Sequence, residues 1–309
     1  MKVLVTGGAG FIGSNIVKLL HQRSYEVIVF DNLSSGYKEN LDECSNIKLV
    51  VGDIRDNEKL NFATKDCRIV FHLAANVGNV RSLQNPIEDS EINILGTLNV
   101  LESARLNGVK KIVYSSSAAI FGEPQYQPID EKHPEEPDSP YGVSKLSGEK
   151  HCLCYSRIYN INVVCLRYFN VYGINQRYDT YGNVIPIFAT LLLQNRPITI
   201  YGDGEQTRDF VNVKDVATAN IMAAEKEGLS GKFNIGSGVS ITIKSLVLMM
   251  RDIINKDVNV NYAPHRKGEI RHSCSDISLA KKYINYNPLT GTYNGLVEYI
   301  EWLKGGLGK

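Results

Sequence analysis

The sequence carries almost no net charge, with 34 Lys and Arg residues against 33 Asp and Glu residues. Without a dominant sign, no overall field draws the chain to nucleic acid or to an anionic membrane. No stretch approaches the roughly 18 apolar residues of a membrane span, and no cleavage site follows a short apolar run near Met1. We therefore expect a globular cytoplasmic protein without nucleic-acid or membrane partners, in which local groups hold any anionic ligand.

Cysteine is scarce, and its spacing does not fit the usual metal sites. No pair has the spacing of a metal-ligand doublet, and Cys152 and Cys154 lie in a helical pattern with no His or Cys cluster nearby. We predict reduced thiols and no bound metal. The cysteines are Cys44, Cys67, Cys152, Cys154, Cys165 and Cys274.

Hydrophobic residues make up 43% of the 309 positions, which is ample for a buried core. In the first half, short β-branched runs alternate with helical patterns such as Ile92 to Leu106, which indicates parallel βαβ units. The runs are almost continuously apolar, as in strands that helices cover on both faces. The predicted class is a doubly wound α/β fold. Its strands are Lys2 to Thr6, Glu26 to Phe30, Ile47 to Val51, Ile69 to Leu73 and Lys111 to Ser115.

A glycine-rich loop follows the first of these strands. Gly8, Gly10 and Gly13 have the spacing that permits a tight turn and lets the backbone approach a pyrophosphate at a helix N-terminus. Asp31 ends the next strand, where a carboxylate accepts hydrogen bonds from the adenosine ribose and repels a 2′-phosphate. We predict a Rossmann-type domain that binds NAD rather than NADP. The alternative is a cluster of turn glycines with Asp31 as a capping residue.

Two further strand ends fall at the carboxyl edge of the sheet, where ligands bind. Gly52-Asp53-Ile54 closes the third strand, and Asp53 is placed to accept from the adenine amino group. The alternative there is local capping of a helix by the Arg55-Asp56 stretch. His72-Leu73-Ala74-Ala75 closes the fourth strand, and we interpret His72 as a packed strand-end residue.

The second half loosens into loops rich in Gly, Asn, Pro and Tyr. Helical patterns recur near Ile185 to Gln194, Val213 to Glu225, Ile243 to Ile254 and Leu296 to Leu303. Runs at Val163 to Arg167 and Lys232 to Ile235 still resemble sheet strands. We predict an NAD-binding domain over residues 1–170, to which about 211–240 returns, and a smaller substrate-binding region over 171–309.

A catalytic pair opens the helix that starts at Tyr141. Tyr141 and Lys145 are four residues apart and share one helical face. A tyrosine has a reference pKa of about 10, but a lysine ammonium and the positive nicotinamide ring stabilise its phenolate, which makes it a usable acid and base. Ser117, in the serine run after the fifth strand, is placed to hold the same substrate hydroxyl. A chance Tyr and Lys at this spacing is the alternative.

These motifs resemble the extended short-chain dehydrogenase/reductase superfamily, and within it the NAD-dependent sugar-nucleotide epimerases. The resemblance covers essentially the whole chain. It rests on the loop from Thr6 to Gly13, on Tyr141 and Lys145, on Leu166 to Gly173, on Gly202-Asp203-Gly204 and on Thr207-Arg208-Asp209-Phe210.

The resemblance implies a tightly held NAD that removes a hydride from sugar C4 and returns it to the opposite face of the 4-keto sugar. It also implies a homodimer through the helices near Ile92 to Leu106 and Tyr141 to Ser156. The expected cofactor-binding residues are Gly7, Gly10, Phe11, Ile12, Gly13, Asp31, Asn32, Asp53, Ile54, Leu73, Ala74, Ala75, Tyr141, Lys145 and Tyr168, with Phe169 near the nicotinamide. The expected substrate-binding residues are Ser117, Tyr141, Asn170, Val184, Arg208, Arg266, Glu269 and Ser273.

Two of the expected substrate residues are arginines that would clasp the phosphates, because guanidinium forks match phosphate oxygens. Each has a simpler alternative. Arg208 has Asp209 beside it and could pair with it. Arg266 belongs to a basic run that could simply be solvated. Asn93 and Asn99 share one helix, and we interpret both as structural.

Family members also include dehydratases, decarboxylases and reductases. Dehydratases resemble one another in a Thr-Asp-Glu set at the site where this chain has Ser117-Ala118-Ala119, so the proton carriers for elimination are missing and epimerisation is favoured. A decarboxylase would act on a sugar acid and would need a group that receives the carboxylate. This alternative stays open because Arg81 could be that group. A non-catalytic NAD-binding regulator is disfavoured, because Tyr141 and Lys145 both persist.

Sugar size is the last expectation. Ser273 falls where epimerases restricted to unsubstituted hexoses resemble one another in a bulky tyrosine, and a small side chain leaves room for an N-acetyl group. The resemblance therefore implies UDP-N-acetylglucosamine and UDP-N-acetylgalactosamine as substrates beside UDP-glucose and UDP-galactose. An ordinary loop serine is the alternative, and the nucleotide and the preferred sugar stay open.

Overall fold

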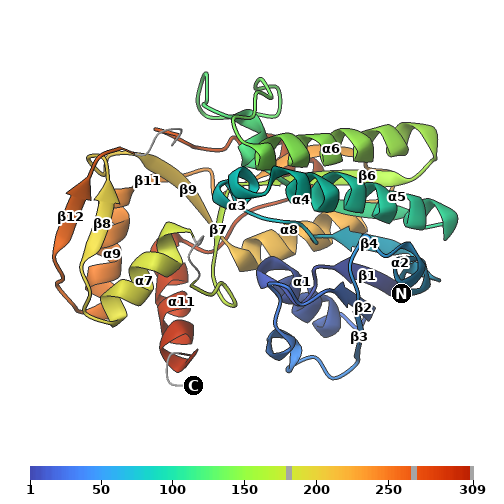
Figure 1. The fold of residues 1–309 in the computed structure, drawn as a ribbon, viewed down its shortest axis with the longest axis horizontal. Coiled ribbons are helices and arrows are strands. Elements are labelled where there is room, and N and C mark those ends of the chain that lie inside the picture. The colour runs from blue at the N-terminus through green and yellow to red at the C-terminus, as the bar shows by residue number, and fades with distance from the viewer. Residues whose placement is uncertain (179–182, 266–269, 307–309) are drawn as a thin grey trace.

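The computed structural model describes residues 1–178, 183–265 and 270–306. A central sheet of seven strands has the order β10-β6-β5-β4-β1-β2-β3, and all neighbours are parallel (Figure 1). Its strands are β1 (Lys2–Thr6), β2 (Glu26–Asp31), β3 (Ile47–Val51), β4 (Ile69–His72), β5 (Lys111–Ser117), β6 (Asn162–Tyr168) and β10 (Gly231–Ile235). The predicted doubly wound α/β class is confirmed.

Helices cover both faces of this sheet. Alternate residues of β1 show why, since Val3 and Val5 pack on one face while Leu4 packs on the other. The first face is covered by α1 (Phe11–Gln22), α8 (Val213–Glu225) and α10 (Ser278–Ile284), and the second by α2 (Asn57–Thr64), α5 (Thr97–Leu106) and α6 (Pro140–Ile158). Short helices α3 (Asn79–Gln84) and α4 (Pro86–Ser90) and the turns η1 (Lys38–Leu41), η2 (Glu91–Gly96) and η3 (Ala118–Phe121) connect these elements.

A smaller unit lies to one side of the central sheet (Figure 1). It has a three-stranded sheet, β11-β9-β7, and a two-stranded sheet, β12-β8. The strands are β7 (Asn170–Tyr172), β8 (Ile198–Tyr201), β9 (Thr207–Asn212), β11 (Ser240–Thr242) and β12 (Val260–Ala263). Helices α7 (Val184–Leu193), α9 (Ile243–Ile254) and α11 (Thr292–Gly306) complete it around a separate apolar core.

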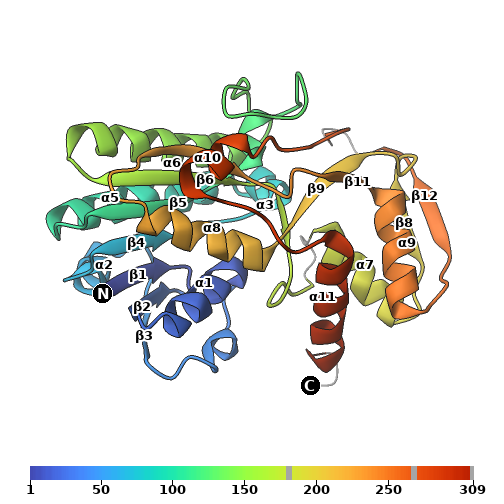
Figure 2. The ribbon, with the colours of Figure 1, turned by 180° about the vertical axis from the view of Figure 1, so that it is seen from behind.

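The sequence prediction and the structure differ in three places. The helix expected over Ile92 to Leu106 is split into the π-helical turn η2 and α5. The strands of the smaller unit, β9 among them, fall in the stretch that the sequence analysis described as loops; in β9 the Thr-Arg-Asp start hides the strand pattern. Beyond β10 and α8, the helix α10 also returns to the central sheet, where it packs against β10 (Figure 2).

No helix within residues 1–178, 183–265 and 270–306 combines the length and the apolar character needed to cross a membrane.

A buried ion network ties α6 to the sheet. Arg167 on β6 is 0% exposed, and its guanidinium donates to Glu149 on α6 through Nε at 3.0 Å and Nη2 at 2.6 Å. Glu135 bonds the same guanidinium, and the Ser116 hydroxyl donates to Glu149 at 2.6 Å. Burial raises the pKa of Glu135, but hydrogen bonds from Lys150 and Lys232 and the charge of Arg167 lower it to about 2.

We expect Arg167→Leu to destabilise the protein by about 3–5 kcal/mol, because it leaves the buried Glu149 carboxylate without its cation, while Glu135 keeps Lys150 and Lys232. Urea unfolding followed by circular dichroism measures this. The matched control is Arg23→Leu, which removes an exposed pair with Glu225 and should cost about 0–1 kcal/mol. Equal losses in the two variants would contradict a structural role for the network.

Candidate active site

The carboxyl ends of β1 and β4 define the point where the sheet order reverses, because the chain continues from β1 to one side and from β4 to the other. Ligands bind in the crevice at such a point. The loop after β1 touches the loop after β4 here. Gly7 has φ 68°, and a Cβ on it would lie 2.7 Å from the Ala74 nitrogen. Only glycine permits this approach.

The glycine loop fits the pyrophosphate of a dinucleotide. A Cβ on Gly13 would lie 2.1 Å from the Gly7 oxygen, so α1 packs directly onto the loop. Gly10 begins α1 without a side-chain cap, and no acidic residue lies in the first turn. The backbone N–H groups of Phe11, Ile12 and Gly13 are therefore not capped by a side chain, and they form the positive end of a helix that suits an anionic ligand.

Asp31 holds two loops together at the end of β2. It is 7% exposed, and its Oδ2 accepts from the Ala9 N–H at 2.9 Å while its Oδ1 accepts from the Leu33 N–H at 2.8 Å. A carboxylate has about four acceptor positions, so further hydrogen bonds to a ribose are compatible with these two. The structure shows the capping role, and the ribose contact stays a prediction that these two bonds permit.

Asp53 has a local partner set that the sequence analysis did not expect. Its Oδ1 accepts from Arg55 Nε at 2.9 Å, and its Oδ2 accepts from Arg55 Nη2 at 2.9 Å and from Asn32 Nδ2 at 3.0 Å. These bonds hold the pKa of Asp53 well below its usual range. The geometry therefore favours a local structural role over the adenine contact, while Asp56 caps α2 through the Lys59 N–H.

His72 is a packed residue, as predicted. It is 1% exposed, and its ring bonds the hydroxyls of Thr6 at 2.8 Å and Thr97 at 3.0 Å. Burial lowers the pKa of His72 to about 3, so the ring is neutral at physiological pH. Leu73 and Ala74 follow it, and their N–H groups bond to the backbone oxygen and hydroxyl of Thr6, so His72 supports the loop rather than performing chemistry.

Tyr141 and Lys145 lie in the first turns of α6, which the Ser139 hydroxyl caps by accepting from the Gly142 N–H at 3.1 Å. A Cβ on Gly142 would lie 2.4 Å from the Ala119 oxygen, so the helix start lies tightly against the turn after β5. This close approach brings Tyr141 to Ser117. The Ser117 Oγ accepts from the Ala119 N–H at 3.1 Å, which orients the hydroxyl, and its hydrogen bond to Tyr141 lowers the phenol pKa.

The predicted lowering of the Tyr141 pKa by Lys145 is not what the chain's own residues produce. Burial, together with the negative charge of Asp89, raises the pKa of Tyr141 to about 12, although the hydrogen bond with Ser117 lowers it. Burial also lowers the pKa of Lys145 to about 8. The Lys145 ammonium lies 4.5 Å from the centre of the Tyr114 ring, a cation–π contact. The positive charge that would make Tyr141 a base must therefore come mainly from the nicotinamide ring.

Two of the residues expected to hold substrate are the first residues of elements in the smaller unit. Asn170 starts β7, and its amide donates to the Asp209 oxygen at 3.2 Å. Val184 starts α7. Tyr168, which was expected to bind the cofactor, is buried, and its hydroxyl donates to Asn220 on α8 at 3.0 Å.

Arg208 and Ser273 lie on adjacent segments. Arg208 Nη1 donates to the Thr207 oxygen at 2.8 Å, and the Ser273 N–H donates to the same oxygen at 3.2 Å. The Asp209 carboxylate accepts from Ser237 at 2.6 Å; its other bonds are to Gly238 and Ser275. Ser273 is 7% exposed. Arg266 and Glu269 lie outside the described residues.

The basic run before Ser273 is partly structural. Arg271 makes a bidentate pair with Asp203, with both N–O distances at 2.8 Å. The solvated-run alternative therefore does not describe Arg271, which instead fixes the segment to the loop after β8.

Sequence reasoning missed a contact between the two units. Asn15 on α1 donates to the Ile174 oxygen at 3.0 Å, and Asn175 donates to the Ser14 hydroxyl at 2.9 Å. The Arg177 guanidinium lies 3.7 Å from the centre of the Tyr37 ring. The loop after β7 is thus hydrogen-bonded to α1, the helix that follows the glycine loop. The Asn residues of this loop were the available signal, but nothing local in the sequence identifies their partners.

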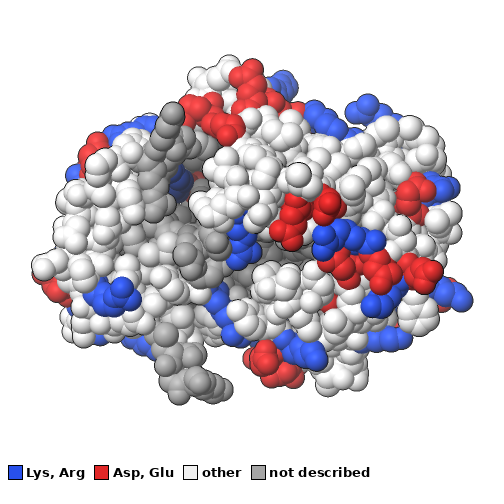
Figure 3. All heavy atoms as spheres, in the orientation of Figure 1, with Lys and Arg blue, Asp and Glu red and all other residues white. Residues whose placement is uncertain are grey.

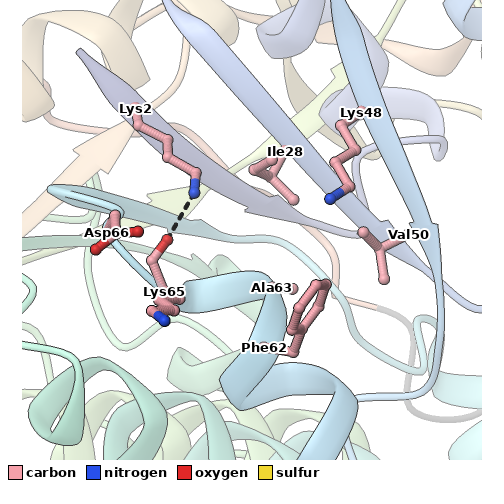
Figure 4. A pocket seen from close by; sticks show the side chains of 8 residues that line it. All are labelled: Lys2, Ile28, Lys48, Val50, Phe62, Ala63, Lys65 and Asp66. Atoms are coloured by element: carbon pink, nitrogen blue, oxygen red, sulfur yellow. Dashed lines mark hydrogen bonds between the residues drawn. The ribbon is translucent and has the colours of Figure 1, made fainter.

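The surface between the two units is hollowed, with basic side chains at its edge (Figure 3). A separate small pocket lies elsewhere (Figure 4). Its lining includes Lys2, Lys48, Phe62 and Asp66. Because Lys2 is the first residue of β1 and the glycine loop follows the last, this pocket is at the opposite end of the sheet from the predicted site.

Comparison with known proteins agrees with this geometry. The model of the NAD dependent epimerase/dehydratase family matches residues 3–236. A UDP-glucose 4-epimerase of Halalkalibacterium halodurans is 36% identical over 323 aligned residues, which cover 98% of this chain and 96% of that protein. The chain therefore belongs to the NAD dependent epimerase/dehydratase family.

Two solved structures have the same fold over nearly the whole chain. The UDP-glucose 4-epimerase of Thermotoga maritima with UDP-glucose has a TM-score of 0.95 and 39% identity, covering 99% of this chain and 100% of that one. The UDP-N-acetylglucosamine 4-epimerase of Methanobrevibacter ruminantium in complex with UDP-N-acetylmuramic acid has a TM-score of 0.95 and 38% identity, covering 99% and 98%. This protein is an NAD-dependent epimerase, and so an isomerase.

We expect Asp31→Asn to reduce the preference for NAD over NADP by at least about tenfold, because like charges a few ångströms apart repel by several kcal/mol at an effective dielectric near 20. The amide oxygen still accepts from one of the two backbone N–H groups. Dissociation constants for both cofactors measure the effect. Asp66→Asn, at the far end of the sheet, should leave the preference unchanged. A parent protein that binds NAD and NADP equally would contradict the assignment.

Proposed function

We propose that the protein interconverts UDP-hexoses at C4 through a transient 4-keto sugar, with Tyr141, Ser117 and Lys145 as its catalytic residues. The observation that carries this is the meeting of Tyr141 on α6 with Ser117 at the end of β5, next to the crevice at β1 and β4. Membership of the family and the names of the relatives support the reaction type.

NAD supplies the hydride acceptor and donor in this reaction when it is bound. Tyr141 takes the proton of the C4 hydroxyl and later returns it. The Ser117 hydroxyl hydrogen-bonds the same oxygen. The Ala119 N–H fixes the orientation of this hydroxyl. Lys145 adds a buried positive charge four residues along the same helix face.

The strand end supports epimerisation rather than dehydration. Elimination of water needs an additional acid and base, and the two residues after Ser117 are Ala118 and Ala119. The turn η3 that contains them packs Ile120 and Phe121 into an apolar cluster with Phe169, so this segment is built for packing.

The proposal extends to N-acetylated sugars. Ser273 is small, and its backbone is fixed beside β9, close to Arg208. One relative of the same fold is named for UDP-N-acetylglucosamine, and another binds UDP-glucose. We therefore propose UDP-glucose, UDP-galactose and their N-acetylated counterparts as substrates, with residues 171–309 as the main substrate-binding region and Arg208, Asn170 and Val184 among its contacts.

A homodimer through α5 and α6 is part of the proposal. Leu106 at the end of α5 is 62% exposed, and Ile158 at the end of α6 is 62% exposed. Apolar side chains on neighbouring helices support an interface there. A cytoplasmic location stays a prediction from the sequence.

We expect Tyr141→Phe to lower turnover of UDP-glucose by about a hundredfold or more, since it removes the group that exchanges the proton. NAD should stay bound, because the glycine loop is untouched. Lys145→Met should act in the same direction. Coupled assays of UDP-galactose formation measure turnover. The matched control is Tyr155→Phe, because Tyr155 lies on the same helix as Tyr141 and its hydroxyl donates to Glu102 of α5. Near-normal turnover of Tyr141→Phe would rule out the assigned base.

We expect Ser273→Tyr to suppress turnover of UDP-N-acetylglucosamine selectively, because the larger ring fills volume that the acetamido group needs. Activity on UDP-glucose should survive, since its C2 carries only a hydroxyl. Product stereochemistry for each substrate, analysed separately, measures the effect, and Ser273→Ala should retain both activities. Equal loss of both substrates, or a parent that refuses UDP-N-acetylglucosamine, would remove Ser273 as the gate.

A further inference from the structure

A buried carboxylate that no step of the proposed reaction uses lies behind the catalytic helix. Asp89 on α4 is 0% exposed. Its Oδ2 accepts from the Ser144 hydroxyl at 2.5 Å, and its Oδ1 accepts from the Asn93 amide at 3.1 Å. Ser144 lies on α6 between Tyr141 and Lys145. One carboxylate is thus bonded to α6 through one oxygen and to η2 through the other. The Asn93 amide also donates directly to the Ser144 hydroxyl at 3.1 Å, so Asp89, Asn93 and Ser144 form one hydrogen-bonded cluster.

Asn93 carries the connection on to the cofactor side. Its Oδ1 accepts from the Asn76 N–H at 2.8 Å, and its Nδ2 donates to the Asn76 oxygen at 2.9 Å. Both backbone groups of Asn76 are therefore held by one side chain. Asn76 belongs to the loop after β4, in which Ala74 contacts Gly7. Asn93 lies in the π-helical turn η2, a kind of local distortion that is frequent at functional sites.

We propose that Asp89 is a positioning residue that fixes the catalytic helix and the cofactor-binding loop after β4 relative to each other, through Ser144 on one side and Asn93 on the other. The proposal rests on the proposed function, in which Tyr141 takes a proton from the same carbon–oxygen unit that loses a hydride. Both transfers need their partners aligned at once, and a misplacement of about 1 Å can cost on the order of a hundredfold in rate. A rigid link between the two sides provides that alignment.

The charge of Asp89 adds a second effect on the same site. It raises the pKa of Tyr141 and opposes the lowering of the Lys145 pKa by burial. The other group that faces Tyr141 is Ser117 on β5. The other groups that face Lys145 are the Tyr114 ring on β5, His72 on β4, Cys165 on β6, and Glu149 and Cys152 on α6. Asp89 is the one negative group among these that acts on both Tyr141 and Lys145.

The test compares two variants that break the link at different points. Ser144→Ala removes the hydroxyl but keeps the carboxylate, and Asp89→Asn removes the charge and one acceptor. We expect each to lower kcat for UDP-glucose by at least about tenfold with KM changed by less than about twofold. The matched controls are two other changes on α4. Ser90→Ala removes a hydroxyl that donates to the Pro86 oxygen of the same helix, and Glu88→Gln changes an exposed side chain. Both should keep parental kcat.

The pH dependence separates positioning from simple damage to the fold. Removing the anion lowers the pKa of Tyr141, so the acidic limb of kcat/KM should move to lower pH in Asp89→Asn. The limb should stay in place in Ser144→Ala, which retains the carboxylate. A loss of structure alone would lower the amount of active enzyme in a variant. It would not shift the acidic limb of the kcat/KM profile in Asp89→Asn while leaving it in place in Ser144→Ala.

Ser144→Ala decides the outcome if Asp89→Asn does not fold, because alanine is the residue best suited to a helix interior. Circular dichroism and retained NAD verify that each variant is folded. A folded Ser144→Ala enzyme with parental kcat would overturn the proposal. Tyr141→Phe tests the proposed function independently: if it is inactive while Ser144→Ala is normal, only the positioning role fails, and if it is active, the catalytic assignment itself fails.

Discussion

The contact of backbone with backbone at the glycine loop is the constraint on which the site depends. Gly13 packs against the Gly7 oxygen, and Gly7 packs against Ala74, at distances that exclude a Cβ. These two contacts bring the start of α1 and the loop after β4 to one point at the reversal of the sheet order. Asp31 then fixes the loop from the other side through Ala9. The cofactor site is thus formed by main chain, with side chains acting as braces.

The helix α6, which carries Tyr141 and Lys145, is held separately and from two directions. Toward its C-terminal half, Glu149 is held by the buried Arg167 of β6. Near its start, Ser144 is held by Asp89 of α4, and Gly142 lets the helix approach Ala119. Buried polar groups are costly unless they are fully bonded. Their use here is consistent with a helix whose position, rather than its stability alone, matters for the reaction.

The sequence predicted what local spacing determines. The glycine loop, Asp31 and the pair Tyr141 and Lys145 all follow from residues on one turn or one helical face, and the apolar strands follow from burial on both sides. The link from Asp89 to Ser144 could not be found this way, because it depends on how α4 packs against α6. The strand β9 was missed because its polar start includes Asp209. The Asp209 carboxylate fits into the strand only because it accepts hydrogen bonds from the distant Ser237 and Ser275. The raised pKa of Tyr141 in the chain alone could not be predicted for a related reason, since burial is a property of the assembled fold.

That corrected pKa has a mechanistic consequence. The chain's own groups keep Tyr141 protonated at neutral pH, because burial and Asp89 raise its pKa while only Ser117 lowers it. A phenolate becomes favourable when a positive ring lies beside it, and the nicotinamide is positive only in its oxidised form. Proton removal by Tyr141 is then tied to the state of the cofactor that can accept a hydride. With a reduced, uncharged nicotinamide beside it, Tyr141 would instead keep its proton, which is the state that the proposed return of a proton to the sugar oxygen requires.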